Sequence, residues 1–191
     1  MLKLRIPMLY SRRSYSLPTP DDTSEPNMPA ILFVCTANRI RSPLAEYLLR
    51  RRLANDVFTA AWRVESAGVW AEPDLPALSA ARQAGAELGV DLSDHRSRRT
   101  DDLNLARYDL ILTMERGQRD MLRVEHPEIA ERIVMLSQVM TGYDYDIADP
   151  PGHTQPAVRS TARDLDDLIN RGVARLIRAV GSGLSANLGG S

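Results

Sequence analysis

Short apolar runs alternate with amphipathic segments along most of this 191-residue chain. A continuous apolar run with β-branched or aromatic members is typical of a strand buried on both faces, and apolar residues at helical spacing are typical of a helix. We predict strands at Ala30–Val34, Trp62–Ser66, Tyr108–Thr113 and Arg132–Leu136, and helices at Ser42–Ala54, Leu78–Leu88, Glu115–Val124 and Pro156–Val180.

Local signals support two of the predicted helix boundaries. Ser42 is followed by Pro43, which suits a helix whose N-cap is Ser42 and whose first helical residue is Pro43. Gly89 directly follows the second predicted helix, where glycine commonly ends a helix.

The order of strands and helices predicts the fold class. Because the two alternate, we predict an α/β fold of three layers, in which a four-stranded parallel sheet is flanked by helices. Ligands of such sheets bind beyond the carboxyl ends of the strands, near the switch in strand order. The turn after Ala30–Val34 is therefore the first place to look for a site.

The chain is long enough for one catalytic domain with its own core. We predict a disordered N-terminal extension at residues 1–28, a single domain at 29–181 and a flexible tail at 182–191, from the Pro-rich and Gly/Ser-rich ends. The basic start of the extension also fits a transit peptide, and a start codon placed upstream of Met28 fits as well. The sequence leaves this choice open.

The charge balance and the cysteine count narrow the function classes. The formal net charge of −1 gives no basic field for nucleic acid, so any anion site must be local. Cys35 is the only cysteine, which excludes an intrachain disulfide and favours a reducing compartment, so we expect a cytoplasmic protein. No apolar run approaches the roughly 18 residues that span a bilayer, so we expect no membrane partner.

The turn after the first predicted strand brings together a cysteine, Cys35, and an arginine, Arg41. A thiolate is stabilised where backbone N–H groups, a helix N-terminus and a guanidinium converge, and the same groups bind phosphate. Arg41 can contact two phosphate oxygens at once, which a lysine cannot do. Taken alone, the spacing also fits a small core cysteine in an arginine-rich chain.

A cysteine that cleaves a phosphoester needs an acid to protonate the departing oxygen. Asp149 lies beside Pro150 after the fourth predicted strand, and hence at the same edge of a parallel sheet as Cys35. Asp144 and Asp146 are alternatives nearby, and Asp-Pro is by default an ordinary turn.

Five segments of the chain form a combined pattern: Val34–Glu46 (VCTANRIRSPLAE), Ser66–Gly68 (SAG), Asp94–Arg98 (DHRSR), Tyr108–Glu115 (YDLILTME) and Asp149–Pro150 (DP). Together they resemble the low-molecular-weight protein tyrosine phosphatase family, in the same order and spacing from about Pro29 to Val180. The resemblance implies that family's fold and a phosphatase that acts through a cysteinyl-phosphate intermediate.

The resemblance also implies roles for individual residues. Cys35 would be the nucleophile, Arg41 would bind phosphate and stabilise the transition state, and Asp149 would act first as acid and then as base. Ser42 would hydrogen-bond the sulfur, and Asn38 would brace the loop. The residues implied to bind substrate are Thr36, Ala37, Asn38, Arg39, Ile40 and Ser42, with Ser66 and His95 as support.

Three positions of the loop depart from the family pattern. Ala37 stands where glycine is common, and Ile40 stands where many members have a second cysteine. Arg39 occupies the position at the pocket mouth, where an apolar residue accompanies phosphotyrosine and threonine accompanies phosphoarginine. The extra cation would favour acidic or multiply phosphorylated substrates, or would point to solvent.

The segment after Asp149 departs as well. Pro151–His153 replaces the aromatic residues that often follow Asp-Pro in the family. Trp70 and Tyr143 or Tyr145 could supply aromatic walls for a phosphotyrosine instead.

We therefore predict a phosphatase for phosphotyrosine or a related phosphomonoester, with protein-arginine phosphatase as the alternative. An arsenate reductase is disfavoured because its redox relay needs further cysteines, and a non-catalytic binding module because the reacting groups are all present. No cofactor or metal ion is expected, since Arg41 and the loop amides supply the charge stabilisation. The expected partner is a phosphorylated protein, for example a tyrosine kinase, or a small phosphoester, bound by a monomer or weak dimer without nucleic acid or membrane.

Overall fold

The computed structural model describes residues 28–54 and 59–181. In these ranges four parallel strands form one sheet: β1 (Ala30–Cys35), β2 (Arg63–Gly68), β3 (Leu110–Thr113) and β4 (Ile133–Met135). The order across the sheet is β2-β1-β3-β4. The chain passes from β1 to β2 on one side and then crosses to β3 on the other, so the strand order switches at β1.

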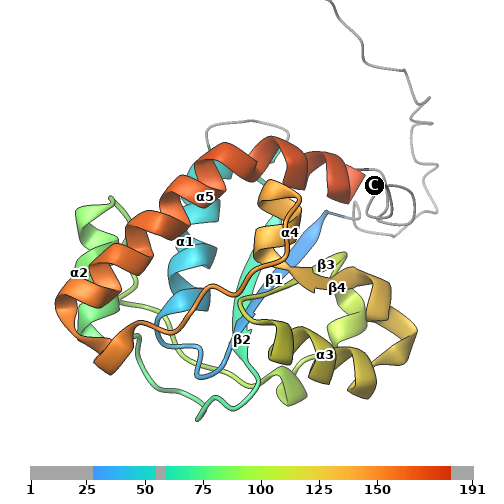
Figure 1. The fold of residues 1–191 in the computed structure, drawn as a ribbon, viewed down its shortest axis with the longest axis horizontal. Coiled ribbons are helices and arrows are strands. Elements are labelled where there is room, and N and C mark those ends of the chain that lie inside the picture. The colour runs from blue at the N-terminus through green and yellow to red at the C-terminus, as the bar shows by residue number, and fades with distance from the viewer. Residues whose placement is uncertain (1–27, 55–58, 182–191) are drawn as a thin grey trace, which may run out of the picture.

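Helices cover both faces of this sheet. They are α1 (Arg41–Leu53), α2 (Ser79–Glu87), α3 (Arg116–Glu125), α4 (Leu136–Thr141) and α5 (Gln155–Gly181). The long α5 packs against α1, α2 and α4 on one face, whereas α3 and short 3₁₀ turns lie on the other (Figure 1). The result is three layers.

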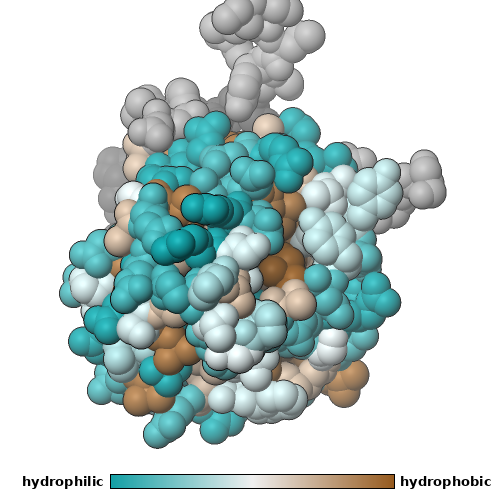
Figure 2. All heavy atoms as spheres, turned by 60° about the vertical axis from the view of Figure 1, so that its left-hand side comes forward, coloured by the Kyte–Doolittle hydropathy of each residue, from teal (hydrophilic) through white to brown (hydrophobic). Residues whose placement is uncertain are grey.

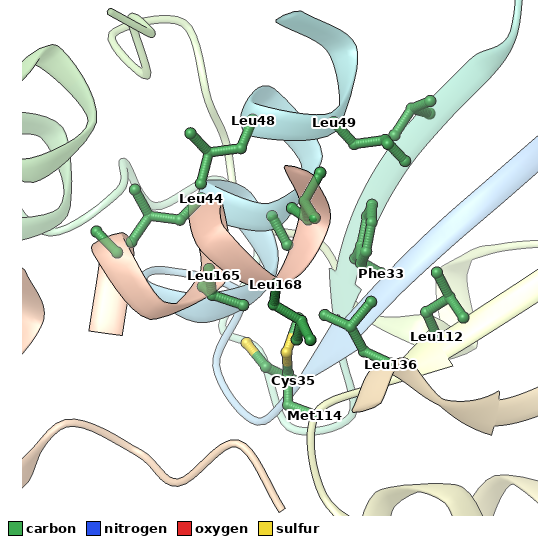
Figure 3. Close-up of a cluster of buried hydrophobic side chains, with 14 of the residues drawn as sticks. Phe33, Cys35, Leu44, Leu48, Leu49, Leu112, Met114, Leu136, Leu165 and Leu168 are labelled. Atoms are coloured by element: carbon green, nitrogen blue, oxygen red, sulfur yellow. The ribbon is translucent and has the colours of Figure 1, made fainter. Parts of the chain in front are cut away.

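β1 contributes to the core on both faces of the sheet. Its six residues are all buried, and alternate side chains point to opposite faces. Ile31 and Phe33 join the larger hydrophobic cluster with α1 and α5, part of which Figure 3 shows, while Leu32 and Val34 join the cluster beneath α3. This packing fixes Cys35 at the end of the strand.

The predicted fold class is confirmed. Every predicted strand and helix that falls in the described ranges is present, with boundaries displaced by one or two residues. The sequence prediction missed the short helix α4, whose first residue, Leu136, was assigned to the preceding strand. Leu136 is buried and continues the strand's apolar run, so no polar position separates the last residue of β4 from the first residue of α4.

The predicted N-cap at Ser42 is wrong. Helix α1 begins at Arg41, its N-cap is Ile40, and no side chain caps it. The Ser42 hydroxyl instead lies 3.0 Å from Cys35 Sγ and accepts a hydrogen bond from Asn38 Nδ2. Because the hydroxyl is engaged in these contacts, no side chain caps the first N–H groups of α1. An anion can therefore bind to them.

The predicted terminal segments lie outside the described residues, Met28 excepted. No helix within the described ranges is long and apolar enough to cross a membrane. Figure 2 shows the face around α2 and the start of α5, where hydrophilic side chains cover most of the surface and hydrophobic ones lie in small hollows.

Candidate active site

The loop of residues 36–40 connects the end of β1 to the start of α1. Cys35 lies at its first edge and is buried, and its Sγ contacts the Ser42 hydroxyl at 3.0 Å. The free N–H groups and the positive dipole end of α1 lie at the other edge of the loop. The loop therefore places the Cys35 sulfur beside N–H groups that can bind an anion.

Asn38 holds this loop in shape. Its backbone has a φ of 55°, in the left-handed region that asparagine tolerates better than most residues. Its Nδ2 donates to both Ser42 Oγ and Ser66 Oγ at 2.9 Å. Its backbone carbonyl accepts from His95 Nε2 at 2.7 Å, and its Oδ1 accepts from the Arg98 N–H at 3.0 Å. The structure thus brings together the three residues predicted to support the loop.

Gly68, at the end of β2, packs directly against the backbone of the loop. A Cβ added there would lie 2.5 Å from the Thr36 carbonyl oxygen and 2.9 Å from the Asn38 nitrogen. Glycine is required at this position because the two backbones approach so closely. Ala37, by contrast, is exposed and is not among the described residues with positive φ, so its methyl group fits.

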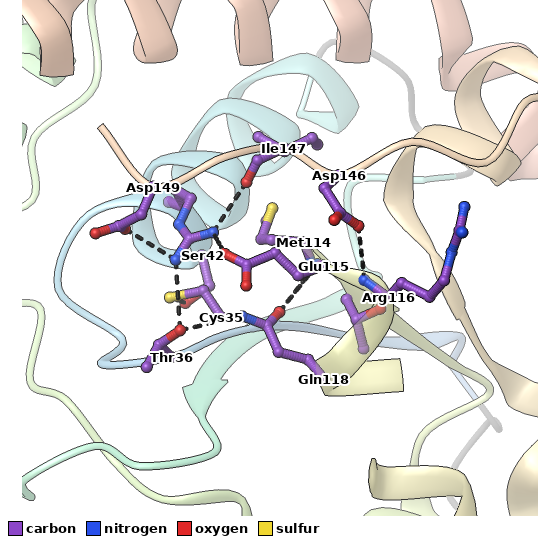
Figure 4. Close-up of polar contacts among 12 residues, drawn as sticks. Cys35, Thr36, Ser42, Met114, Glu115, Arg116, Gln118, Asp146, Ile147 and Asp149 are labelled. Atoms are coloured by element: carbon purple, nitrogen blue, oxygen red, sulfur yellow. Dashed lines mark hydrogen bonds and ion pairs between the residues drawn. The ribbon is translucent and has the colours of Figure 1, made fainter. Parts of the chain in front are cut away.

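The Arg41 guanidinium contacts four of the residues that Figure 4 labels, which are Thr36, Glu115, Ile147 and Asp149. Its side chain is only 2% exposed and pairs with the Glu115 and Asp149 carboxylates, the latter at 2.8 Å from Nη2. The Ile147 carbonyl accepts from Nη1 at 2.9 Å, and Thr36 Oγ1 lies 3.4 Å from Nη2. Arg41 Nε is buried and has no acceptor among the described residues. Such an orphan donor suits a site for an anion.

Asp149 is the predicted acid that reaches the site. Its Oδ1 contacts Arg41, and its Oδ2 lies 2.6 Å from His153 Nε2. The two alternative acids, Asp144 and Asp146, bind residues outside the pocket. Asp144 pairs with Arg119 at 2.8 Å, and Asp146 accepts a hydrogen bond from the Arg116 N–H at 2.8 Å.

A pocket of about 450 Å³ joins these groups. Trp70, Tyr143 and Tyr145 are not among the described residues that line it, although Tyr145 lines a neighbouring pocket that shares Asp149. Trp70 and Tyr143 instead lie largely in solvent, at 71% and 74% exposure. The lining residues are Cys35, Thr36, Ala37, Arg39, Ile40, Arg41, Leu78, Glu115, Asp149 and His153.

Arg39 lies at this pocket and is anchored on one side. Its Nε donates to the Pro76 carbonyl at 3.0 Å, which fixes the plane of the guanidinium. Within the described ranges, no group of three or more His, Cys, Asp or Glu side chains is arranged to hold a metal ion.

Sequence reasoning missed Glu46, which lies behind the loop. Its Oε2 accepts from the Ser66 hydroxyl at 2.5 Å, and its Oε1 pairs with Arg50 at 2.8 Å. Burial raises the pKa of Glu46 above its usual value, although Arg50 and Ser66 oppose this shift. Burial also lowers the pKa of His95, so the neutral imidazole is favoured.

Glu115 and Gln118 were also missed as site residues. They form a capping box at the start of α3, in which each side chain bonds the backbone of the other. Gln118 Nε2 also donates to Thr36 Oγ1 at 3.2 Å, and Glu115 pairs with Arg41. The Glu-x-x-Gln spacing predicts the start of a helix, but it does not predict that this helix start contacts the loop after β1.

The sequence of this chain matches known proteins over most of its length. A family model described as low molecular weight phosphotyrosine protein phosphatase matches residues 30–183. A protein-arginine-phosphatase of Geobacillus stearothermophilus is 35% identical over 141 residues, which are 74% of this chain and 91% of the relative. The low molecular weight protein-tyrosine-phosphatase Etp of Escherichia coli is 34% identical over 128 residues, or 67% of this chain and 81% of Etp.

Solved structures are similar as well. A low molecular weight protein tyrosine phosphatase from T. tengcongensis has a TM-score of 0.69 and 33% identity, covering 78% of this chain and 98% of that one. The YwlE arginine phosphatase from Geobacillus stearothermophilus has a TM-score of 0.68 and 32% identity, covering 81% and 96%.

Proposed function

We propose that this chain, which belongs to the low molecular weight phosphotyrosine protein phosphatase family, hydrolyses a phosphomonoester through a cysteinyl-phosphate on Cys35. One observation carries the proposal: the Cys35 sulfur, the Arg41 guanidinium and the Asp149 carboxyl line the same pocket at the carboxyl end of β1. A nucleophile, an anion-binding group and an acid are the three parts that phosphoryl transfer needs.

In the first step, the Cys35 thiolate attacks phosphorus and the bond to the departing oxygen breaks. The phosphate oxygens replace Asp149 and Glu115 as partners of Arg41, whose unpaired Nε gains an acceptor. The freed Asp149, which takes up a proton from solvent once it no longer pairs with Arg41, donates that proton to the departing oxygen. The acid is needed most where that oxygen is a poor leaving group.

In the second step, water attacks the cysteinyl-phosphate and Cys35 leaves as a thiolate. Asp149 now accepts the proton of the water, which returns the acid to its starting form. The Ser42 hydroxyl, 3.0 Å from the sulfur, donates to the departing thiolate. Inorganic phosphate is the product.

The pocket mouth supports phosphotyrosine in a protein as the substrate. Ile40 and Leu78 provide apolar surface for an aromatic ring, and Arg39 adds a cation beside it. A phosphoarginine would bring its own guanidinium close to Arg39, which disfavours it electrostatically. Acidic residues next to the phosphotyrosine would instead pair with the free side of Arg39. Phosphoarginine is the second candidate, because the similar protein and the similar structure from Geobacillus stearothermophilus are named arginine phosphatases.

The chemistry is tested with para-nitrophenyl phosphate in the presence of EDTA and a reductant. We expect turnover by the wild type and none by Cys35→Ser, while Thr113→Ser, a matched change in the neighbouring strand β3, retains activity. Activity that survives in Cys35→Ser, or that requires a divalent ion, would contradict the proposal.

The substrate is tested with three peptides of one sequence frame: phosphotyrosine with acidic neighbours, phosphotyrosine with neutral neighbours, and phosphoarginine. We expect kcat/KM to fall in that order for the wild type. Arg39→Gln should remove the preference for acidic neighbours, and Arg82→Gln on the exposed side of α2 should keep it. Faster turnover of phosphoarginine by the wild type would contradict the choice of phosphotyrosine.

A further inference from the structure

The turn after Asp149 directs an imidazole back onto that carboxyl. The 3₁₀ turn Pro151–His153 follows Pro150, and a backbone hydrogen bond joins the His153 N–H to the Pro150 carbonyl at 3.1 Å. His153 Nε2 lies 2.6 Å from Asp149 Oδ2, and the ring lines the same pocket as Cys35.

This turn adopts a costly backbone. Gly152 has a φ of 59° and His153 has a φ of 51°, so two successive residues are left-handed. Glycine tolerates this conformation, whereas a histidine there costs on the order of 1 kcal/mol. A strained residue whose side chain reaches a reacting group is a reason to look for a role in the reaction.

The hydrogen bond has a defined direction when Asp149 is ionised. A carboxylate only accepts, so Arg41 donates to Oδ1 and His153 Nε2–H donates to Oδ2. Among the described residues, Arg41 and His153 are the partners of this carboxyl. His153 Nδ1 has no partner in the described ranges, which leaves it free to carry the lone pair.

Substrate binding changes this arrangement. In the mechanism proposed above, Arg41 turns from Asp149 to the phosphate, which leaves His153 as the remaining partner of the carboxyl. Asp149 is 48% exposed and would otherwise be free to rotate toward solvent. We propose that His153 is a positioning residue for the general acid: by donating to Oδ2 it keeps the acidic proton on Oδ1, toward the departing oxygen. This inference rests on the acid role proposed for Asp149.

A plain surface ion pair is the competing explanation, since the His153 side chain is also 49% exposed. Exposed pairs contribute about 0 to 1 kcal/mol to stability and have no effect on which substrates are slowed. The two explanations therefore differ in the dependence of the rate on the leaving group. Stability alone cannot separate them.

The experiment compares phenyl phosphate, a poor leaving group, with para-nitrophenyl phosphate, a good one, by kcat/KM, which reports the first step. We expect His153→Ala to lose about tenfold on phenyl phosphate and less than about twofold on para-nitrophenyl phosphate, because a misplaced acid matters only where protonation is needed. His153→Gln, which retains an N–H donor, should restore most of the loss. His126→Ala, at the far end of α3, is the matched control and should change neither rate.

The same measurements in an Asp149→Asn background separate the two proposals. There, His153→Ala should cost nothing further, because no acidic proton remains to be positioned. Equal slowing of both esters by His153→Ala, or a further tenfold loss in Asp149→Asn, overturns the positioning role alone. If Asp149→Asn itself slows both esters equally, the acid role is overturned first, and this inference with it.

Discussion

At the scale of single residues, the shape of the loop after β1 depends on buried polar groups that are hydrogen-bonded. Asn38 illustrates this, because both ends of its amide and its backbone carbonyl are hydrogen-bonded. Leaving one such group without a partner costs about 1 to 3 kcal/mol, more than a typical exposed contact contributes. The loop after β1 is therefore sensitive to substitutions that remove one hydroxyl or amide.

Ser42→Ala should slow the breakdown of the cysteinyl-phosphate. In the second step we expect the single hydrogen of this hydroxyl to be donated to the departing sulfur. A hydrogen bond to a charged group contributes about 1.5 to 3 kcal/mol. We expect kcat to fall about tenfold or more, and the burst of para-nitrophenol in stopped flow to become larger than in the wild type. Thr113→Val removes an equally buried hydroxyl from the sheet and should leave the burst unchanged. An unchanged kcat in Ser42→Ala would contradict this role.

Glu46→Gln should alter how stability depends on pH. Burial raises the pKa of Glu46 in the folded protein above its usual 4.5, so its contribution to stability is full below that value and is lost as the pH rises through the folded pKa. Glutamine stays neutral throughout. We expect the free energy of unfolding, from urea titrations between about pH 4 and 8, to fall in the wild type relative to Glu46→Gln as the pH rises.

Glu65→Gln is the matched control for this measurement. Burial opposes ionisation of Glu65, but the Tyr108 hydroxyl, Arg98 and Arg63 together lower its pKa below 4.5. Its contribution is therefore present above 4.5 and is lost as the pH falls through the folded pKa, the reverse of Glu46. The same slope in both variants would show that Glu46 is not the source of the effect.

At the scale of elements, the sequence predicted what depends on periodicity and missed what depends on tertiary contacts. β1 was predictable because all six of its residues are apolar and buried. The role of Ser42 could not be predicted, because the Cys35 sulfur and the Asn38 amide contact its hydroxyl and the residue does not cap the helix. Glu46 and Arg50 look in the sequence like an ordinary exposed pair four positions apart on a helix, and only the packing of α1 on β2 buries the carboxylate.

Some residues of the candidate site could likewise be predicted from the sequence, and others could not. The groups proposed to react were predictable because the family resemblance places them at fixed positions. His153 was seen only as a departure from the family pattern, since its contact with Asp149 depends on two left-handed residues in succession. The Pro151-Gly152 pair indicates a turn, but nothing in the sequence shows that the turn brings His153 onto Asp149.

Gly68→Ala tests how tightly β2 supports the loop. The added Cβ would meet backbone atoms of Thr36, Ala37 and Asn38 at 2.5 to 3.0 Å, and backbone cannot yield as the end of a flexible side chain can. We expect kcat/KM for para-nitrophenyl phosphate to fall at least tenfold and stability to fall by about 1 to 3 kcal/mol. Gly117→Ala in α3 is the control: nothing lies within 4 Å of its Cβ, so it should stabilise by about 0.5 to 1 kcal/mol and keep the rate. Equal kinetics in the two variants would contradict the close fit.

At the scale of the whole molecule, one strand connects the core to the chemistry. β1 is central in the sheet, belongs to both hydrophobic clusters and ends at Cys35. The residues that line the site come from distant parts of the chain, among them positions 35–41, 115 and 149, and they meet because parallel strands end at the same edge. The site therefore depends on the sheet and on the loops that follow its strands.

A chain that begins at Met28 should have the same activity and stability as the full chain. Both hydrophobic clusters and all the proposed site residues lie between positions 30 and 176, and the family model also begins at residue 30. Because these groups supply the folding energy and the chemistry, we expect kcat/KM and the urea midpoint to agree within error between the two chains. A chain that begins at Phe33 is the contrasting variant: it also deletes Ala30, Ile31 and Leu32, which are buried members of the two clusters, and should lose several kcal/mol of stability. A marked loss of activity or stability in the chain starting at Met28 would instead show that the first 27 residues belong to the domain, and would move the predicted boundary.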